Sequence, residues 1–364
     1  MKTKPTIMTG KKLLPVLLMA FALPVFAQRE DLRLIPYRKG DLWGYAAADK
    51  SILIKPEYSE ANLFYAGFAS VKKGDKYGYI NRDGKVVIPF KFYVAKPFRV
   101  GYFPKGGKIL TADDLEDDQK KILFAGASLR KDGYEICINT KGETMPKCPA
   151  IPENSAPEIN KPSTVTIESN YSTIQKSDLF DKITGDYKLL AGADETYYIA
   201  TRNNNYGVFN NKFEVIVPFE YSAIEKIKIG AMNYLVAEKN GLKGVFFGNG
   251  SPYITVENNK VQHIAAKNAE NYFIISRDGK TGIKDMKHNY VVEMKYAGIM
   301  YDSTGGFIVT NDNNLTGFWF LNNFMLEPKY SMVKVLPGGE YVKVKLPNGK
   351  WGYVNSSGIE FFEE

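Results

Sequence analysis

The sequence predicts an all-β protein built from tandem repeats of about 35 residues. Three observations predict this fold class. A short phrase centred on a Gly recurs seven times, an aromatic residue follows several of these glycines at a nearly constant distance, and turn residues separate short β-rich segments. Helical periodicity is absent from these units. The 364 residues are 44% hydrophobic and 13% aromatic, which is too apolar for a disordered chain.

The recurring phrase reads KYGYINRDG at 76–84 and KWGYVNSSG at 350–358. Its Gly has seven copies, of which the last five are spaced by 37, 38, 35 and 35 residues and the first two by 34. Such a spacing indicates a structural unit used many times rather than one catalytic signature. We assign as the structural signature Trp43, Gly44, Tyr77, Gly78, Tyr206, Gly207, Gly244, Gly282, Gly317, Trp351 and Gly352.

A second marker supports the first. An aromatic residue closes a later phrase at 14, 14, 14, 14 and 13 residues after the Gly, as Tyr58, Phe92, Tyr221, Tyr296 and Tyr330. With the turn residues between them, each unit is expected to form three or four short strands joined as hairpins. The two residues after each Gly are mainly apolar and point to opposite faces of a strand, so we expect sheets covered on both faces. The Gly itself is expected to allow a close backbone approach or a bulge.

These markers together resemble the WG-repeat family, also called KWG repeats, over most of residues 37–105 and 195–364. The resemblance implies an architecture of short-stranded repeats and no particular chemistry. We expect a β-propeller-like array, with an open, twisted β-solenoid as the alternative, because about nine units fit the chain and that is many for a propeller. The chain departs from the family pattern where Lys243, Thr281 and Thr316 precede the Gly.

The middle of the chain, residues 106–195, is irregular. Thr111, the acids after it and the lysines 120–121 predict a short helical insertion around 111–124. YEICINTKG at 134–142 is interpreted as a decayed unit, and a second decayed unit is expected over 164–190. The proline-rich stretch 149–162 predicts an extended connector.

The first 27 residues are interpreted as a cleaved signal peptide, with the mature chain starting near Gln28. Lysines precede an apolar run at 13–26 that is too short to span a bilayer, although a short N-terminal anchor is the alternative. We therefore expect one mature domain, 28–364, exported to a bacterial periplasm or the extracellular space, without a later transmembrane segment. Removing the four lysines of 1–27 leaves 44 basic against 40 acidic residues, so nucleic-acid binding is poorly motivated.

The sequence offers no catalytic constellation, cofactor motif or metal-ligand spacing. His263 is expected in a strand and His288 in a turn, so neither predicts catalysis. Cys137 and Cys148 are a possible disulfide in an exported protein, with two unpaired thiols as the alternative. Trp319 is a weak candidate for a ligand platform, although its position in the repeat favours the core.

We therefore expect an exported, non-catalytic binding or scaffold protein of the cell envelope. It would recognise a protein or a glycan through its repeat surface. The alternatives are an envelope carbohydrate-active enzyme with a carboxylate pair and a purely structural surface component.

Overall fold

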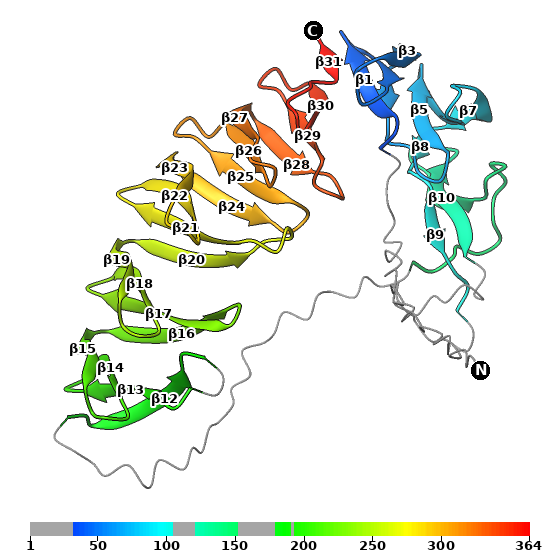
Figure 1. Ribbon diagram of the computed structural model, residues 1–364. Helices are drawn as coiled ribbons and strands as arrows, with labels where there is room; N and C mark the ends of the chain where they lie inside the picture. The colour runs from blue at the N-terminus through cyan, green and yellow to red at the C-terminus, as the bar shows by residue number, and fades with distance from the viewer. Residues whose placement is uncertain (1–31, 105–120, 152–178, 191–192) are drawn as a thin grey trace, which may run out of the picture.

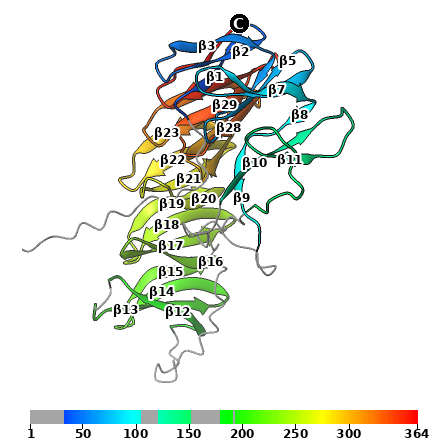
Figure 2. The ribbon, with the colours of Figure 1, turned by 90° about the vertical axis from the view of Figure 1, so that its right-hand side faces the viewer.

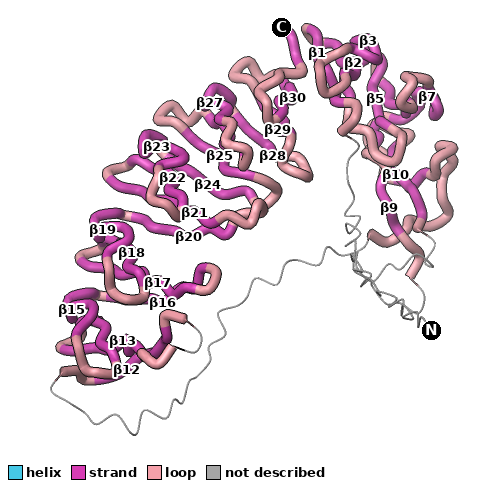
Figure 3. Tube along the Cα trace, in the orientation of Figure 1, coloured by secondary structure: helices cyan, strands magenta, loops and turns pink. Residues whose placement is uncertain are grey.

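The computed structural model describes residues 32–104, 121–151, 179–190 and 193–364. The signal peptide predicted over 1–27, residues 111–120 of the predicted helix and most of the predicted connector lie outside these ranges. The described residues form strands, turns and loops with no helix, as Figure 3 shows. None of them belongs to a helix that could cross a membrane.

The prediction of a helix over 111–124 is wrong for its last residues, which are the ones that the structure describes. Residues from Ile122 onward form a strand, β10 (Ile122–Ser128), which pairs with antiparallel strands along its length. Its apolar residues are buried by these neighbours, and this tertiary packing overrides the local helix signal.

The strands form eight sheets, and all pairings except one are antiparallel. The N-terminal sheets contain β1 (Ile35–Lys39), β2 (Leu42–Ala46) and β3 (Ile52–Tyr58), then β4 (Glu60–Ala61), β5 (Ala69–Lys73), β6 (Lys76–Ile80) and β7 (Val86–Phe92), then β8 (Val94–Ala95), β9 (Arg99–Gly101), β10 and β11 (Ile136–Ile138).

The remaining five sheets repeat one plan, in which consecutive strands lie side by side. They are β12 (Lys182–Lys188), β13 (Thr196–Arg202), β14 (Asn205–Asn210) and β15 (Val215–Tyr221); β16 (Ala223–Ile229), β17 (Met232–Lys239), β18 (Leu242–Phe247) and β19 (Pro252–Asn258); β20 (Lys260–Ala265), β21 (Asn271–Arg277), β22 (Lys280–Asp285) and β23 (Tyr290–Tyr296); β24 (Gly298–Asp302), β25 (Gly306–Thr310), β26 (Thr316–Phe320) and β27 (Met325–Tyr330); and β28 (Met332–Val335), β29 (Tyr341–Lys345) and β30 (Trp351–Asn355). Four of these five sheets are four-stranded meanders, the sheet type of β-propeller blades, and the fifth has three strands.

The sheets follow one another along an open arc, with the sheet of β12 at one end and the sheet of β10 at the other (Figures 1 and 2). The first strands β16, β20, β24 and β28 lie on the concave side, and β15, β19, β23 and β27 lie on the convex side. The units are therefore propeller-like, as predicted, and the array that they build is open.

The first and last strands of the described residues meet in the middle of this arc rather than at its tips. The last strand, β31 (Phe362–Glu363), pairs in parallel with β1 and so completes the N-terminal sheet. Arg38 fastens this junction. Its guanidinium donates to the carbonyl of Trp351 at 2.8 Å and to the carboxylate of Glu364 at 2.8 Å, and its side chain is almost completely buried.

In the described residues, seven hydrophobic clusters lie between neighbouring sheets, one for each pair, and two smaller clusters lie at the terminal sheets. Between the sheets of β20 and β24, for example, Ile283 and Tyr296 of one sheet pack against Phe307 and Trp319 of the other. The sheets inside the array thus bury both faces, which accounts for the apolar residues at successive strand positions.

Candidate functional site

The signature glycines have a packing role. In six of the seven units the strand after the Gly bulges toward it, and the pairing register shifts across the Gly. Gly352 instead packs against the ring of Phe362. A Cβ atom placed on Gly44 would lie 2.2 Å from the carbonyl oxygen of Ile54, and one on Gly317 would lie 2.2 Å from that of Leu326. A side chain cannot fit at this distance, so the repeated Gly is required by a repeated backbone contact.

The aromatic residues before the glycines are half-buried at the junctions between sheets. The ring of Trp43 meets that of Tyr353 edge-on with centroids 6.2 Å apart, which joins the N-terminal sheet to the sheet of β30. The ammonium of Lys343 lies 5.2 Å from the ring of Trp351. Tyr77 donates a hydrogen bond to Glu60, which also pairs with Lys72. These contacts join strands and sheets to one another.

Trp319 does not provide a ligand platform. Its side chain is 2% exposed, and its ring packs between Tyr272 and Phe307 with centroids 5.4 Å from each. The second position after the Gly faces the preceding sheet in this unit, so a Trp there fills the core between sheets.

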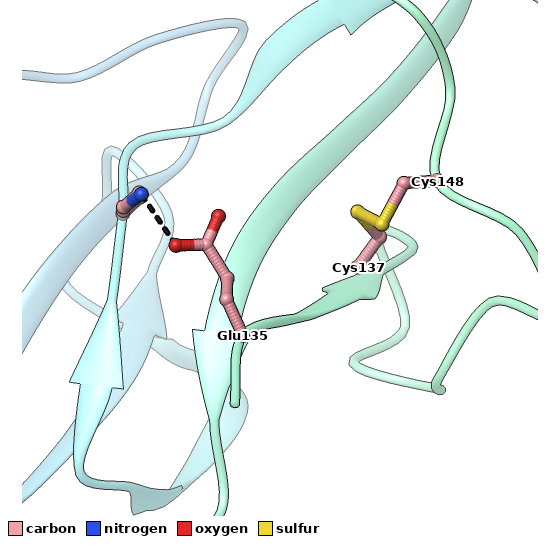
Figure 4. The surroundings of a disulfide bond; sticks show 4 residues. Glu135, Cys137 and Cys148 are labelled. Atoms are coloured by element: carbon pink, nitrogen blue, oxygen red, sulfur yellow. Dashed lines mark ion pairs between the residues drawn. A yellow bond between two sulfur atoms is a disulfide. The ribbon is translucent and has the colours of Figure 1, made fainter. Parts of the chain in front are cut away.

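Cys137 and Cys148 form a disulfide with Cα atoms 5.3 Å apart (Figure 4). The bond ties β11 to the segment that follows it. That segment reaches back across the sheet, where Ala150 pairs with Tyr102 and Pro149 approaches Gly101. The disulfide therefore holds a covering segment on the sheet at one end of the array. An ion pair between Lys96 and Glu135 lies on the same sheet.

The described residues contain no group of three or more His, Cys, Asp or Glu side chains that could hold a metal ion. His263 lies in β20, where its Nε2 atom is 2.9 Å from the side-chain oxygen of Asn271. His288 lies in a turn with its ring centroid 4.2 Å from that of Tyr253. Wherever the pKa of a described carboxyl group is shifted, it is lowered by hydrogen bonds or lysines, as for Glu57 beside Lys73 and Asp285 beside Asn289.

The turns at one end of the sheets form a more variable surface. In an antiparallel meander the first and third turns lie at the same end of the sheet. The third turns repeat one five-residue framework. In most of them an Asn or Asp at the first position accepts the backbone N–H groups of the third and fifth residues, as Asn81 and Asp285 do. The fourth residue has a positive φ, as at Gly84 and Asn323.

The side chains displayed on this framework change from unit to unit. The second residue of the third turn is Ala48, Arg82, Asn211, Gly248, Met286, Leu321 or Ser356. The repeat pattern does not single out these positions as a possible binding surface, because the pattern consists of what the units share. The signal is present in the sequence as the positions at which aligned units differ.

Two adjoining cavities lie among these turns, with volumes of about 240 and 300 Å³. They share Asn268 and Leu321, and together they form a groove across the sheets of β20, β24 and β28. We call this the turn groove. Its walls are the turns at 266–270, 285–289, 302–305, 320–324 and 336–340, together with Ser356.

The sheets, their seven intersheet clusters and the repeated Gly contact define a tandem-repeat β-protein with propeller-like units. A family model described as "WG containing repeat" matches residues 43–77, 77–104 and 206–242. The chain therefore contains WG repeats, as the resemblance in its sequence predicts.

Solved structures give weaker likenesses. Hsv2p from Kluyveromyces lactis is 15% identical over 50% of this chain, with a TM-score of 0.24, and the match spans only 62% of that protein. The Dos1 propeller is 12% identical over 82% of this chain and 78% of its own, with a TM-score of 0.23. A catalytically inactive virginiamycin B lyase from Staphylococcus aureus is 12% identical over 90% and 97%, with a TM-score of 0.20. No curated protein matches the chain. These values are too low to transfer a function.

Proposed function

We propose that this protein is an exported, non-catalytic binding scaffold of the cell envelope, which recognises a protein or glycan partner through the surface of its repeats. The observation that carries the proposal is the division between shared and variable residues. The residues shared by the units, above all Gly44, Gly317 and their equivalents, are used in packing. The residues that differ, such as Arg82 and Leu321, stand on the turns. Binding residues on variable loops held by a rigid scaffold are a common arrangement in proteins.

Export rests on the N-terminal charge and apolar run of residues 11–27. The disulfide between Cys137 and Cys148 supports it, because disulfides persist in oxidising compartments. Expression of the full chain in a bacterial host, followed by N-terminal sequencing of the exported product, tests this part. We expect a mature protein that begins near Gln28, and a product that retains Met1 in the cytoplasm would contradict export.

The binding role is tested with purified residues 28–364 whose fold has been checked by circular dichroism. The protein is applied to a glycan array and, in parallel, cross-linked to an envelope extract and identified by mass spectrometry. We expect saturable binding of at least one glycan or one envelope protein that unfolded protein does not show. Folded protein that binds nothing in either assay would contradict a binding scaffold.

A further inference from the structure

The turn groove is held in shape by contacts between the turns of different sheets. The backbone N–H of Lys267 donates to the hydroxyl of Tyr301 at 2.9 Å, and the amide of Asn322 donates to the carbonyl of Ser356 at 2.9 Å. In a third contact the backbones of two turns approach each other directly. A Cβ atom added to Gly305 would lie only 2.5 Å from the Cα of Gly339. Three successive sheets are therefore joined at the groove, which is largely preformed, as ligand sites usually are.

Two apolar side chains line the groove at the second position of the third turn. Units outside the groove carry Arg82 and Asn211 there, whereas the three units around the groove carry Met286, Leu321 and Ser356. Leu321 borders both cavities and packs on the cluster between the sheets of β20 and β24. An apolar side chain at this point gives a ligand a surface to pack against.

The walls offer hydrogen-bonding groups of both kinds. Asn268, Asn322 and Asn323 each carry an amide that both donates and accepts. The carboxylates of Glu270 and Glu340 make no hydrogen bond or ion pair within the described part of the chain, so they are available as acceptors. The charged lining residues are two lysines and three acids, so neither sign dominates the groove.

From this combination we infer that the turn groove binds a neutral oligosaccharide. A sugar presents hydroxyl groups that donate and accept, together with an apolar ring face, and these match the amides and carboxylates of the walls and Leu321 of the floor. A ligand with a strong charge of either sign would meet like charges in the groove. This inference rests on the proposed binding function and specifies the partner and the place.

The test is a calorimetric titration of residues 28–364 with a panel of neutral tetrasaccharides of glucose, mannose and N-acetylglucosamine, alongside acidic oligosaccharides of uronic acids. We expect saturable binding of at least one neutral member and weaker binding of the acidic ones. Asn322→Ala, which removes a wall amide, is expected to weaken that binding about tenfold. Leu321→Ser introduces the residue that an equivalent turn already carries as Ser356, and it is expected to weaken binding to a similar extent.

The chain supplies a matched control. Asn249 occupies the same turn position as Asn322, and its side-chain oxygen accepts the N–H of Ser251 at 3.0 Å, as that of Asn322 accepts the N–H of Phe324 at 3.1 Å. Asn249→Ala therefore removes the same turn contact outside the groove, and we expect it to leave binding unchanged.

Three results would overturn the inference: no neutral saccharide of the panel binds, only acidic ones bind, or the variants at Asn322 and Asn249 weaken binding equally. If the protein still captures an envelope protein in the cross-linking assay, the binding scaffold stands and only the saccharide groove is wrong. If both assays are blank, the proposed function fails as well.

Discussion

At the scale of single residues, the signature is explained by a backbone contact. The sequence predicts a Gly beside a bulge, and the structure supplies the partner, which is a carbonyl group of the following strand such as that of Ile54. The partner could not be predicted, because the bulge depends on how two strands pair. The burial of Trp319, in contrast, could be predicted, because its position in the repeat favours the core.

Gly317→Ala tests this contact. The new Cβ would meet the carbonyl of Leu326 at 2.2 Å, and forced contacts of this kind in a packed core cost about 1–3 kcal/mol of unfolding free energy. Gly298→Ala is the control in the same sheet, because a Cβ there has no atom within 4 Å. Thermal unfolding should show a lower Tm for the first variant alone, and equal effects would argue against the contact.

Buried tyrosines predict how stability changes at high pH. Burial, with a smaller contribution from a neighbouring glutamate, raises the pKa of Tyr58 and of Tyr296 to about 12. In the unfolded chain a tyrosine ionises near its ordinary value of about 10. Above that pH the unfolded state therefore loses protons that the folded state retains, and the free energy of unfolding falls as the pH rises toward 12.

Melting curves recorded from pH 8 to pH 12, together with the ultraviolet absorbance of tyrosinate, check this expectation. We expect Tm to fall above about pH 10, and part of the tyrosinate signal to appear only on unfolding. A Tm that stays constant through this range, with all tyrosines titrating in the folded protein, would contradict it.

At the scale of strands and sheets, repeated units were predictable and irregular ones were not. Strands with the Gly phrase and a closing aromatic, such as β6 and β7, lie where the sequence places them. The sheet of β10 lacks these markers, and the sequence predicts a helix over its first residues. The charged residues before Ile122 are typical of the two ends of a helix. Strand β10, however, is formed by pairing with strands distant in the sequence, including β8.

The disulfide should stabilise mainly this terminal sheet. Its loop is short, with a sequence separation of 11, and closing such a loop contributes about 3 kcal/mol. In a repeat array each unit contacts only its neighbours, so the loss should remain local. In the double variant Cys137→Ala and Cys148→Ala, hydrogen exchange should accelerate in β10 and β11 and stay unchanged in β20–β23. Equal acceleration throughout would show that the array unfolds as one unit.

At the scale of the whole molecule, the array is an open arc, and the first and last described strands pair in its middle. The pairing of β31 with β1 and the contacts of Arg38 make this junction. It lies outside the repeat pattern, because β31 carries no Gly phrase and its Phe362 is not 13 or 14 residues after Gly352. The sequence could therefore predict the units and their stacking, but not that β31 pairs with β1 within the arc.

The central claim is that shared residues build the array and turn residues bind. An exchange of turns tests it most directly. Residues 286–288 and 321–323 are both replaced by the Arg-Asp-Gly of 82–84, which fits the same framework with a glycine at the position of positive φ. Tm and the affinity for the captured ligand are then measured on the same protein. We predict a folded protein whose Tm falls by a few degrees at most, since Leu321 also packs on the intersheet cluster, and an affinity at least about tenfold weaker. An unchanged affinity in the folded variant would contradict the account.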